Sequence, residues 1–217
     1  MAFLEKYRFS LLFVTLLWTI GGAALLAEFG LSGVLSVLIL LNLLVLLAVL
    51  SGQWALRVGW GLFILSLISW GLSTWVAITA FNPGGQISAV ILLVLGTLGC
   101  LRVAFSPGPV DRERLAAALD LYLLLGLIFA LIFTVIAELL PGSFHFAAAQ
   151  HVAFATRPLS DMVYFSFVTM ATLGYGDIIP LSGSAKGLAI LEAIIGQMYL
   201  VVVVARLVSL YRESEEK

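Results

Sequence analysis

Long apolar runs alternate with short polar stretches along the chain, and six of these runs have roughly the length of a membrane-spanning helix. Such a helix needs about 20 mostly apolar residues to cross a hydrocarbon core of about 30 Å. The runs show no apolar–polar alternation with a period of two, so the pattern favours helices over a transmembrane barrel. We therefore predict membrane helices near residues 8–29, 31–50, 55–80, 86–105, 115–140 and 184–210.

The composition indicates an integral membrane protein. Hydrophobic residues make up 62% and charged residues 11% of the 217 positions, and the mean hydropathy is +1.16, so most of the chain cannot face water. The net charge of -1 offers no basic surface for nucleic acid. Cys100 is the single cysteine of the sequence, which excludes a disulfide within the chain, and we expect it to be a small buried hydrophobe.

The distribution of positive charge predicts the orientation of the helices, because Lys and Arg are enriched in cytoplasmic loops. With both termini in the cytoplasm, Arg157 and Lys186 are the two basic residues outside, and nine are inside. We therefore expect a protein of the cell membrane with both termini cytoplasmic. The nine inner residues are Lys6, Arg8, Arg57, Arg102, Arg112, Arg114, Arg206, Arg212 and Lys217.

A break after the fourth apolar run divides the chain into two regions. The residues SPGP at 106–109 end the fourth helix, and Asp111 can cap the next one. The loops before the break are short, so we expect residues 1–106 to form a bundle of four helices. Residues 107–217 are expected to form a helix, a re-entrant loop and a last helix. The predicted fold class is an all-α membrane protein.

The connection between the last two membrane helices, 141–183, has 43 residues and is too long for a turn. Within it, residues 160–171 form about three apolar turns that begin with Ser160 and Asp161, two good capping residues. A helix of this length cannot cross the membrane and suits a re-entrant segment. The chain must then return through 172–180 without helical hydrogen bonds, which is tolerated only inside protein or along a water-filled path.

The motif TLGYGD at residues 172–177 lies between that short helix and the last membrane helix. This arrangement resembles the pore of the tetrameric potassium channels, whose filter is usually written TVGYG followed by Asp. Leu173 in place of Val is the departure within the motif. The resemblance covers roughly residues 115–210. It implies a homotetramer around a central axis, in which each subunit supplies an outer helix, a pore helix at 160–171, the filter and an inner helix at 184–210.

The residue types of the motif suit the binding of a dehydrated K+ ion. Backbone carbonyls replace the water of the ion if they point to one axis, as alternating left-handed and right-handed conformations allow. Gly174 and Gly176 adopt positive φ at little cost and are spaced two apart. By resemblance, K+ binds the carbonyls of Thr172, Leu173, Gly174 and Tyr175, and the Thr172 hydroxyl closes the inner site. The side chains of Leu173 and Tyr175 are expected to point away from the ion and brace the loop.

Several side chains outside the motif are candidates to support it. Asp177 is expected to accept a hydrogen bond from Tyr164 of the pore helix. Glu192 in the last helix is a candidate to brace the pore helix or respond to pH, because carboxylates in membrane helices are costly and often functional. A hydrogen-bonded structural role is the alternative for both Glu192 and Glu138. Val168 stands where some relatives carry a filter-backing Glu.

The last helix offers two candidate faces for an inner gate. Gly196 lies twenty residues after Gly176 and matches the hinge glycine of the family, although a packing role is the alternative. One face contains every fourth residue from Gly196, and a rotated face is equally apolar. The first face carries Leu200, Val204 and Val208, and the second carries Val201 and Ala205.

The first four helices lack the pattern of a voltage sensor. Voltage-sensing relatives carry Arg or Lys at every third position of the fourth helix, whereas here that helix carries Arg102 at its inner end. We therefore expect little voltage dependence. The sequence does not define the gating stimulus, and the filter itself, lipid, tension or a separate subunit are the alternatives.

The sequence as a whole predicts a potassium-selective channel that conducts passively and is not an enzyme. K+ is then the permeant ion, no organic cofactor is expected, and the partners are membrane lipid and further copies of the chain. A non-selective cation channel is the first alternative, if Ala171, Met170 and Val168 pack the filter loosely. A non-conducting subunit or scaffold is the second. His145 and His151 are expected to be solvated.

Overall fold

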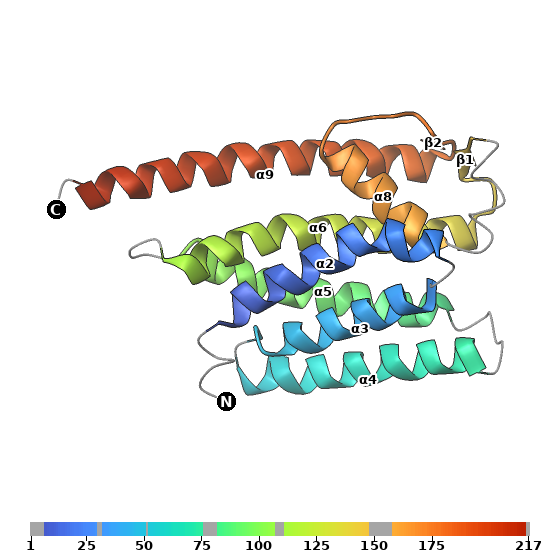
Figure 1. Cartoon of the computed structure of the whole chain (residues 1–217), viewed down its shortest axis with the longest axis horizontal. Coiled ribbons are helices and arrows are strands. Elements are labelled where there is room, and N and C mark those ends of the chain that lie inside the picture. Colours follow the sequence, from blue (N-terminus) through green and yellow to red (C-terminus); the bar gives the residue numbers. More distant parts are fainter. Residues whose placement is uncertain are drawn as a thin grey trace.

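The computed structural model describes residues 7–29, 32–50, 52–75, 82–106, 111–147 and 158–215. Helices dominate this part of the chain, as expected for an all-α membrane protein, and two short strands pair near one end (Figure 1). The helices are α2 (Arg8–Glu28), α3 (Ser32–Leu47), α4 (Gln53–Trp75), α5 (Asn82–Ala104), α6 (Arg112–Leu139), α8 (Pro158–Met170) and α9 (Gly183–Glu215), and the strands are β1 (Phe144–Phe146) and β2 (Ile178–Pro180).

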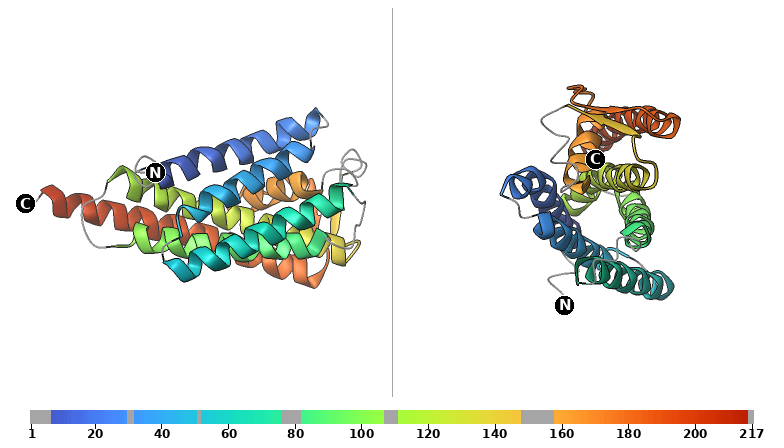
Figure 2. Two further views of the ribbon diagram at one scale, coloured as in Figure 1. Left: turned by 90° about the horizontal axis from the view of Figure 1, so that it is seen from below. Right: turned by 90° about the vertical axis from the view of Figure 1, so that its right-hand side faces the viewer.

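Helix α6 is the centre of the bundle. It packs against α2, α5, α8 and α9, and buried side chains occupy most of its length. Figures 1 and 2 show α9 on one side of α6, while α3 and α4 lie on the opposite side. Asp111 caps α6 as expected, because its Oδ1 accepts a hydrogen bond of 2.9 Å from the backbone N–H of Arg114.

Each of the six predicted membrane helices corresponds to a helix in the structure. Among the described residues, four stretches are long and apolar enough to cross a membrane. The apolar stretches of α2 and α3 that the search covered, Arg8–Gly22 and Val34–Leu47, are shorter. The bounds differ from the prediction by several residues at some ends, since α5 begins at Asn82 and α9 continues to Glu215. The four long stretches are Gln53–Leu72, Gly85–Ala104, Arg112–Leu139 and Gly183–Val203.

Helix α8 begins two residues before the predicted start of the pore helix. Pro158 is its first residue, a position that favours proline because the missing N–H would have no partner there. Ser160 and Asp161 therefore lie inside the first turn, and the predicted start of the helix at these two residues is wrong. The carboxylate of Asp161 in the first turn still stabilises the helix, because a negative charge interacts favourably with the positive end of the helix dipole.

Polar contacts tie the N-terminal helices to both ends of α6. At one end the carboxylate of Glu113 accepts hydrogen bonds from the backbone N–H of Phe9, at 3.0 Å, and from the hydroxyl of Ser10, and so caps the start of α2. At the other end Nε2 of Gln86 donates to Oε1 of Glu138 at 3.0 Å. The alternative of a hydrogen-bonded structural acid therefore fits Glu138.

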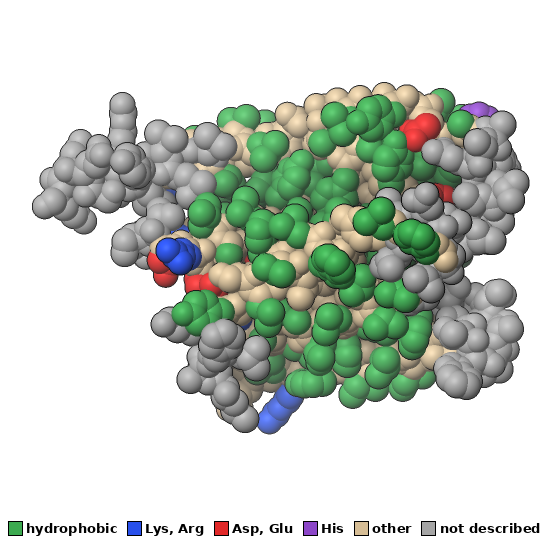
Figure 3. Space-filling model, in the orientation of Figure 1, with side chains coloured by type: hydrophobic (Ala, Val, Ile, Leu, Met, Phe, Trp, Pro, Cys, Tyr) green, Lys and Arg blue, Asp and Glu red, His purple; other side chains and the backbone are tan. Residues whose placement is uncertain are grey.

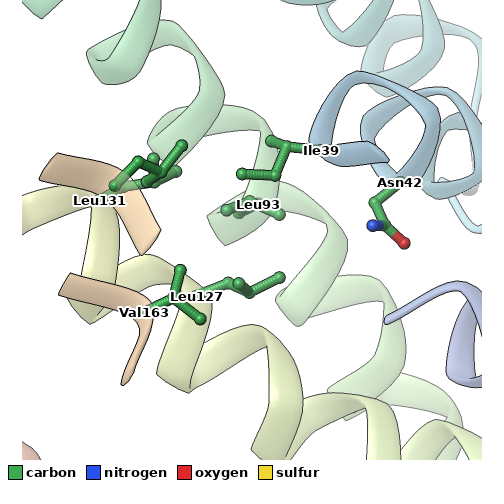
Figure 4. A pocket seen from close by; sticks show the side chains of 7 residues that line it. Ile39, Asn42, Leu93, Leu127, Leu131 and Val163 are labelled. Carbon is green, nitrogen blue, oxygen red and sulfur yellow. The ribbon is translucent and has the colours of Figure 1, made fainter. Parts of the chain in front are cut away.

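An apolar cavity lies where α3, α5, α6 and α8 meet, so α3 and α5 of the first four-helix region lie beside α8. Aliphatic side chains from these helices converge around it (Figure 4). Asn42 is the polar residue of its wall, and its amide nitrogen donates to the carbonyl of Leu38 and to the hydroxyl of Thr19 on α2. The lining residues are Ile39, Asn42, Leu93, Leu127, Leu131, Leu159 and Val163.

A second cluster of aromatic side chains joins α6, β1 and α8. The ring centroids of Phe133 and Phe165 are 5.1 Å apart, and Phe144 lies 5.8 Å from the first ring and 5.6 Å from the second. All three pairs are edge-to-face, the arrangement that the ring quadrupoles favour. This cluster holds the middle of α8 against the C-terminal part of α6.

The distribution of hydrophobic and charged side chains on the surface is typical of a membrane protein. Figure 3 shows hydrophobic side chains over the middle of the molecule, whereas the charged side chains on this face lie mostly near its ends. Large apolar side chains are exposed along α4 and α9, among them Trp60, Ile64, Ile190 and Ile194. In a bilayer these side chains contact lipid or neighbouring protein instead of water.

Replacing Gly126 of α6 with alanine is expected to destabilise the protein by about 1–3 kcal/mol, the usual cost of overpacking. A Cβ there would lie 2.5 Å from Cζ of Phe167, so the ring of Phe167, or α8 with it, would have to shift. The midpoint of thermal unfolding in detergent measures the effect. Gly61→Ala on α4 is the matched control, because no atom lies within 4 Å of the added Cβ. Equal midpoints for the two variants would contradict the close packing.

Candidate functional site

The loop after α8 has an alternating backbone. Thr172, Gly174 and Gly176 have φ angles of 58°, 57° and 78°, so every second residue is left-handed. The residue types predict positive φ for the two glycines but not for Thr172. Thr172 is the non-glycine residue with positive φ in the described part of the chain, and this conformation costs an L-residue roughly 1–2 kcal/mol.

The conformation of Thr172 has a local cause, which is the way α8 ends. The N–H of Thr172 donates to the carbonyl of Thr169 at 3.0 Å, and the N–H of Leu173 donates to the carbonyl of Val168 at 2.9 Å. These two bonds define a Schellman motif, in which the first residue past the cap is left-handed. Thr172 is that residue, so the end of the helix and the start of the alternating loop coincide.

The loop is exposed on the single chain. Residues 171–176 are all exposed, and it arches away from the bundle between α8 and β2 (Figure 1). The side chain of Leu173 is 56% exposed, so its own chain does not hold it in place. The ring of Tyr175 is nearly parallel to that of Tyr164, with centroids 6.4 Å apart. Bracing by Leu173 therefore requires atoms from outside this chain.

The C-terminal end of the loop is fixed by Asp177. The expected hydrogen bond is present, because the hydroxyl of Tyr164 donates to Oδ2 of Asp177 at 2.8 Å. Burial, together with this hydrogen bond, raises the pKa of Tyr164 to about 12, so the phenol keeps the proton that it donates at neutral pH. Oδ1 of Asp177 accepts a bond of 3.1 Å from the N–H of Ile178.

A two-stranded sheet, which the sequence pattern does not predict, continues this attachment. Strand β1 pairs antiparallel with β2, and Phe146 lies opposite Ile178. Beyond the sheet, the N–H of Ala147 donates to the carbonyl of Asp177 at 3.0 Å, and the N–H of Leu181 donates to that of Ser143 at 2.8 Å. His145 lies on β1 and is exposed, whereas His151 lies outside the described residues.

Helix α9 contacts the C-terminal end of α8 through two adjacent residues. A Cβ on Gly196 would lie 2.4 Å from Cγ and 3.1 Å from the carbonyl oxygen of Met170, so Gly196 allows the two helices to touch. Nε2 of Gln197 donates to that same carbonyl at 3.2 Å. This close contact fits the packing role of Gly196, which the sequence left open beside the role of a hinge. Gln197 was missed, because a single Gln in an apolar run gives no signal of its partner.

Glu192 is fully buried one helical turn before Gly196 and approaches α8. Its Oε1 lies 2.5 Å from the hydroxyl of Ser166, and this hydroxyl lies 2.7 Å from the carbonyl oxygen of Gly126 on α6. Helices α6, α8 and α9 are thus joined at one point. Val168, where some relatives carry a glutamate, is buried and has no side chain that could replace this link.

The structure does not distinguish the two candidate gate faces of α9. Leu200 on one face and Val201 on the other are both exposed on the single chain. Ala205 is exposed as well. Val204 and Val208 lie within α9, but their side chains are outside the part that the structure describes.

The chain is similar to known ion channel proteins. The family described as "Ion channel" matches residues 118–213, which contain α8, the loop and most of α6 and α9. Protein LctB of Bacillus caldotenax is 30% identical over 126 residues, which cover 57% of this chain and 91% of that protein. No solved structure matches the chain significantly.

Plant potassium channels are also similar to the chain. Two pore potassium channel c of Oryza sativa subsp. japonica is 35% identical over 77 residues, or 36% of this chain and 16% of that protein. Two-pore potassium channel 5 of Arabidopsis thaliana is 28% identical over 113 residues, or 51% and 24%. The chain thus spans a quarter or less of the length of these relatives. The chain belongs to the ion channel family that it matches and is a multi-pass membrane protein.

Replacing Tyr164 with phenylalanine should loosen the outer end of the loop. The ring is retained, but Oδ2 of Asp177 loses its donor. Hydrogen exchange of the amides in residues 172–178 is expected to become about tenfold faster, equivalent to about 1.4 kcal/mol. Exchange measured by mass spectrometry in detergent tests this. Tyr122→Phe on α6 removes a tyrosine hydroxyl elsewhere and should not change exchange in the loop. Equal protection in both variants would show that this bond does not hold the loop.

Proposed function

We propose that the chain is the subunit of a potassium-selective channel and that residues 172–177 are its selectivity filter. The observation that carries the proposal is the left-handed backbone at Thr172, Gly174 and Gly176. When every second residue is inverted, successive carbonyls along the strand can face the same side. A row of such carbonyl oxygens replaces the hydration shell of K+.

The ion sites follow from this arrangement. The carbonyl oxygens of Thr172, Leu173, Gly174 and Tyr175 bind K+, and the hydroxyl of Thr172 completes the innermost site. Gly176 ends the row, and Asp177 fixes its outer end. K+ is the permeant ion, and conduction is passive. The names of the plant relatives support potassium as the ion.

One chain supplies only part of each ring of oxygens, so we propose a homotetramer around a central axis. The exposure of the filter and of α9 supports this, because both need cover from other copies. Residues 190, 191, 194, 198 and 201 of α9 are large, apolar and exposed on the single chain. Leu200, Val204 and Val208 are the candidate lining of the inner gate, with Gly196 as hinge or packing residue. Membrane lipid contacts the outer surface.

The proposed organisation has two domains in the cell membrane. Residues 1–106 form the N-terminal bundle and residues 107–217 the pore domain. Both termini are cytoplasmic, and the filter opens to the outside. The basic residues of α2, α4 and α5, Arg8, Arg57 and Arg102, each lie close to a helix end, which suits this orientation.

Gly174→Ala should abolish selectivity for K+ over Na+. The φ of 57° at this position disfavours an L-residue by roughly 1–2 kcal/mol in each subunit, so the carbonyl row is lost. Reversal potentials of purified protein in bilayers, with opposed K+ and Na+ gradients, measure the result. Gly183→Ala at the start of α9, where the added Cβ meets no atom within 4 Å, is the control.

A wild-type reversal potential near zero in these gradients would support the non-selective alternative. Protein that assembles as a tetramer but passes no ion would support the non-conducting alternative.

The channel should show little dependence on voltage. A charge that crosses the whole field gains about 2.3 kcal/mol per 100 mV, and an arginine at a helix end crosses only a fraction of it. Open probability, recorded during voltage steps in bilayers, should therefore change only gradually with voltage. A steep sigmoidal opening curve would contradict the absence of a sensor, and Arg102→Gln would then show whether this charge is responsible.

A further inference from the structure

The hydroxyl of Ser166 lies between two oxygen atoms of other helices. Its Oγ is 2.7 Å from the carbonyl oxygen of Gly126 on α6 and 2.5 Å from Oε1 of Glu192 on α9. Ser166 and Glu192 are both fully buried. Both distances are those of hydrogen bonds, so each contact needs a hydrogen atom between its two oxygens.

Counting hydrogens shows where the second one must be. A serine hydroxyl carries one hydrogen and can donate it to one of the two neighbours. The carbonyl oxygen of Gly126 carries none. The second hydrogen must therefore belong to Glu192, whose carboxyl group is a donor only when it is protonated. Glu192 then donates to Ser166, and Ser166 donates to Gly126.

The surroundings of Glu192 agree with a neutral acid. Its Oε2 is buried and has no hydrogen-bond partner among the described residues. A bare ionised oxygen in that position costs far more than the carbonyl oxygen of a neutral acid. On α6, the titratable side chain that interacts electrostatically with Glu192 is Tyr122. The titratable residues of α8 are Asp161 and Tyr164. Those of α9 nearest in sequence, Lys186 and Tyr199, are about 9 and 10 Å away along the helix axis.

We propose that Glu192 is a protonated positioning residue, and that its proton completes a relay from α9 through Ser166 to α6 that holds the pore helix behind the filter. The second half of this proposal rests on the proposed function. Ser166 lies six residues before Thr172 on the helix that ends in the filter. Loss of the proton leaves Ser166 with one hydrogen for two acceptors, so α8 loses its bond to either α6 or α9.

Infrared spectroscopy tests the proton without any ion conduction. The difference spectrum between wild type and Glu192→Gln, at neutral pH, should contain the C=O stretching band of a protonated carboxyl group, and the band should shift in D2O. Glu138→Gln is the matched control, since that carboxyl accepts from the amide of Gln86 and its geometry requires no proton. A carboxylate band in place of the carboxyl band would overturn the protonation of Glu192, whatever the protein conducts.

Ion selectivity as a function of pH tests the positioning role. The ratio of K+ to Na+ permeability in the wild type should fall about tenfold as the pH is raised and Glu192 ionises. Glu192→Gln, whose amide N–H still donates to Ser166, should keep the ratio within about twofold at every pH. Ser166→Ala should have a low ratio at every pH. An equal pH dependence in wild type and Glu192→Gln, or a normal ratio in Ser166→Ala, would overturn the role.

Discussion

A chain that leaves a helix at membrane depth must find partners for its peptide groups, because lipid offers none. Residues 171–177 meet this constraint at their two ends. At the N-terminal end, the amides of Thr172 and Leu173 donate back to α8, and at the C-terminal end Asp177 bonds to Tyr164 and to the segment after β1. The backbone between these two ends is anchored on both sides but exposed in the single chain. The helices and the small sheet hold this exposed loop in position.

The sequence predicts the helices well because the length and apolar character of a run are enough to identify a membrane helix. It also predicts the two positive φ angles at Gly174 and Gly176 and the pairing of Tyr164 with Asp177. The left-handed Thr172 was not predictable from residue type, because it depends on how α8 terminates. Strand β1 has three residues, too few for a pattern of alternation.

Contacts between helices were the least predictable part of the site. Gly126 admits the ring of Phe167, Gly196 admits Met170, and Gln197 bonds to the end of α8, yet each is an isolated residue in an apolar run. Glu192 stands out in the sequence because it is an acid, but its partner Ser166 does not. Such partners depend on which helix faces meet, and one chain without its relatives contains little information on that. Together these contacts attach α8 to α6 and α9 along its length.

The pairing of β1 with β2 has a mechanical consequence. Strand β1 begins five residues after the end of α6, and β2 follows the loop directly, so the C-terminal mouth of the loop is attached to the end of α6. A displacement of that helix end, from whatever force, is passed on to the mouth through backbone hydrogen bonds instead of being absorbed by a slack connection. The C-terminal end of α6, the two-stranded sheet and the mouth of the loop thus form one connected unit.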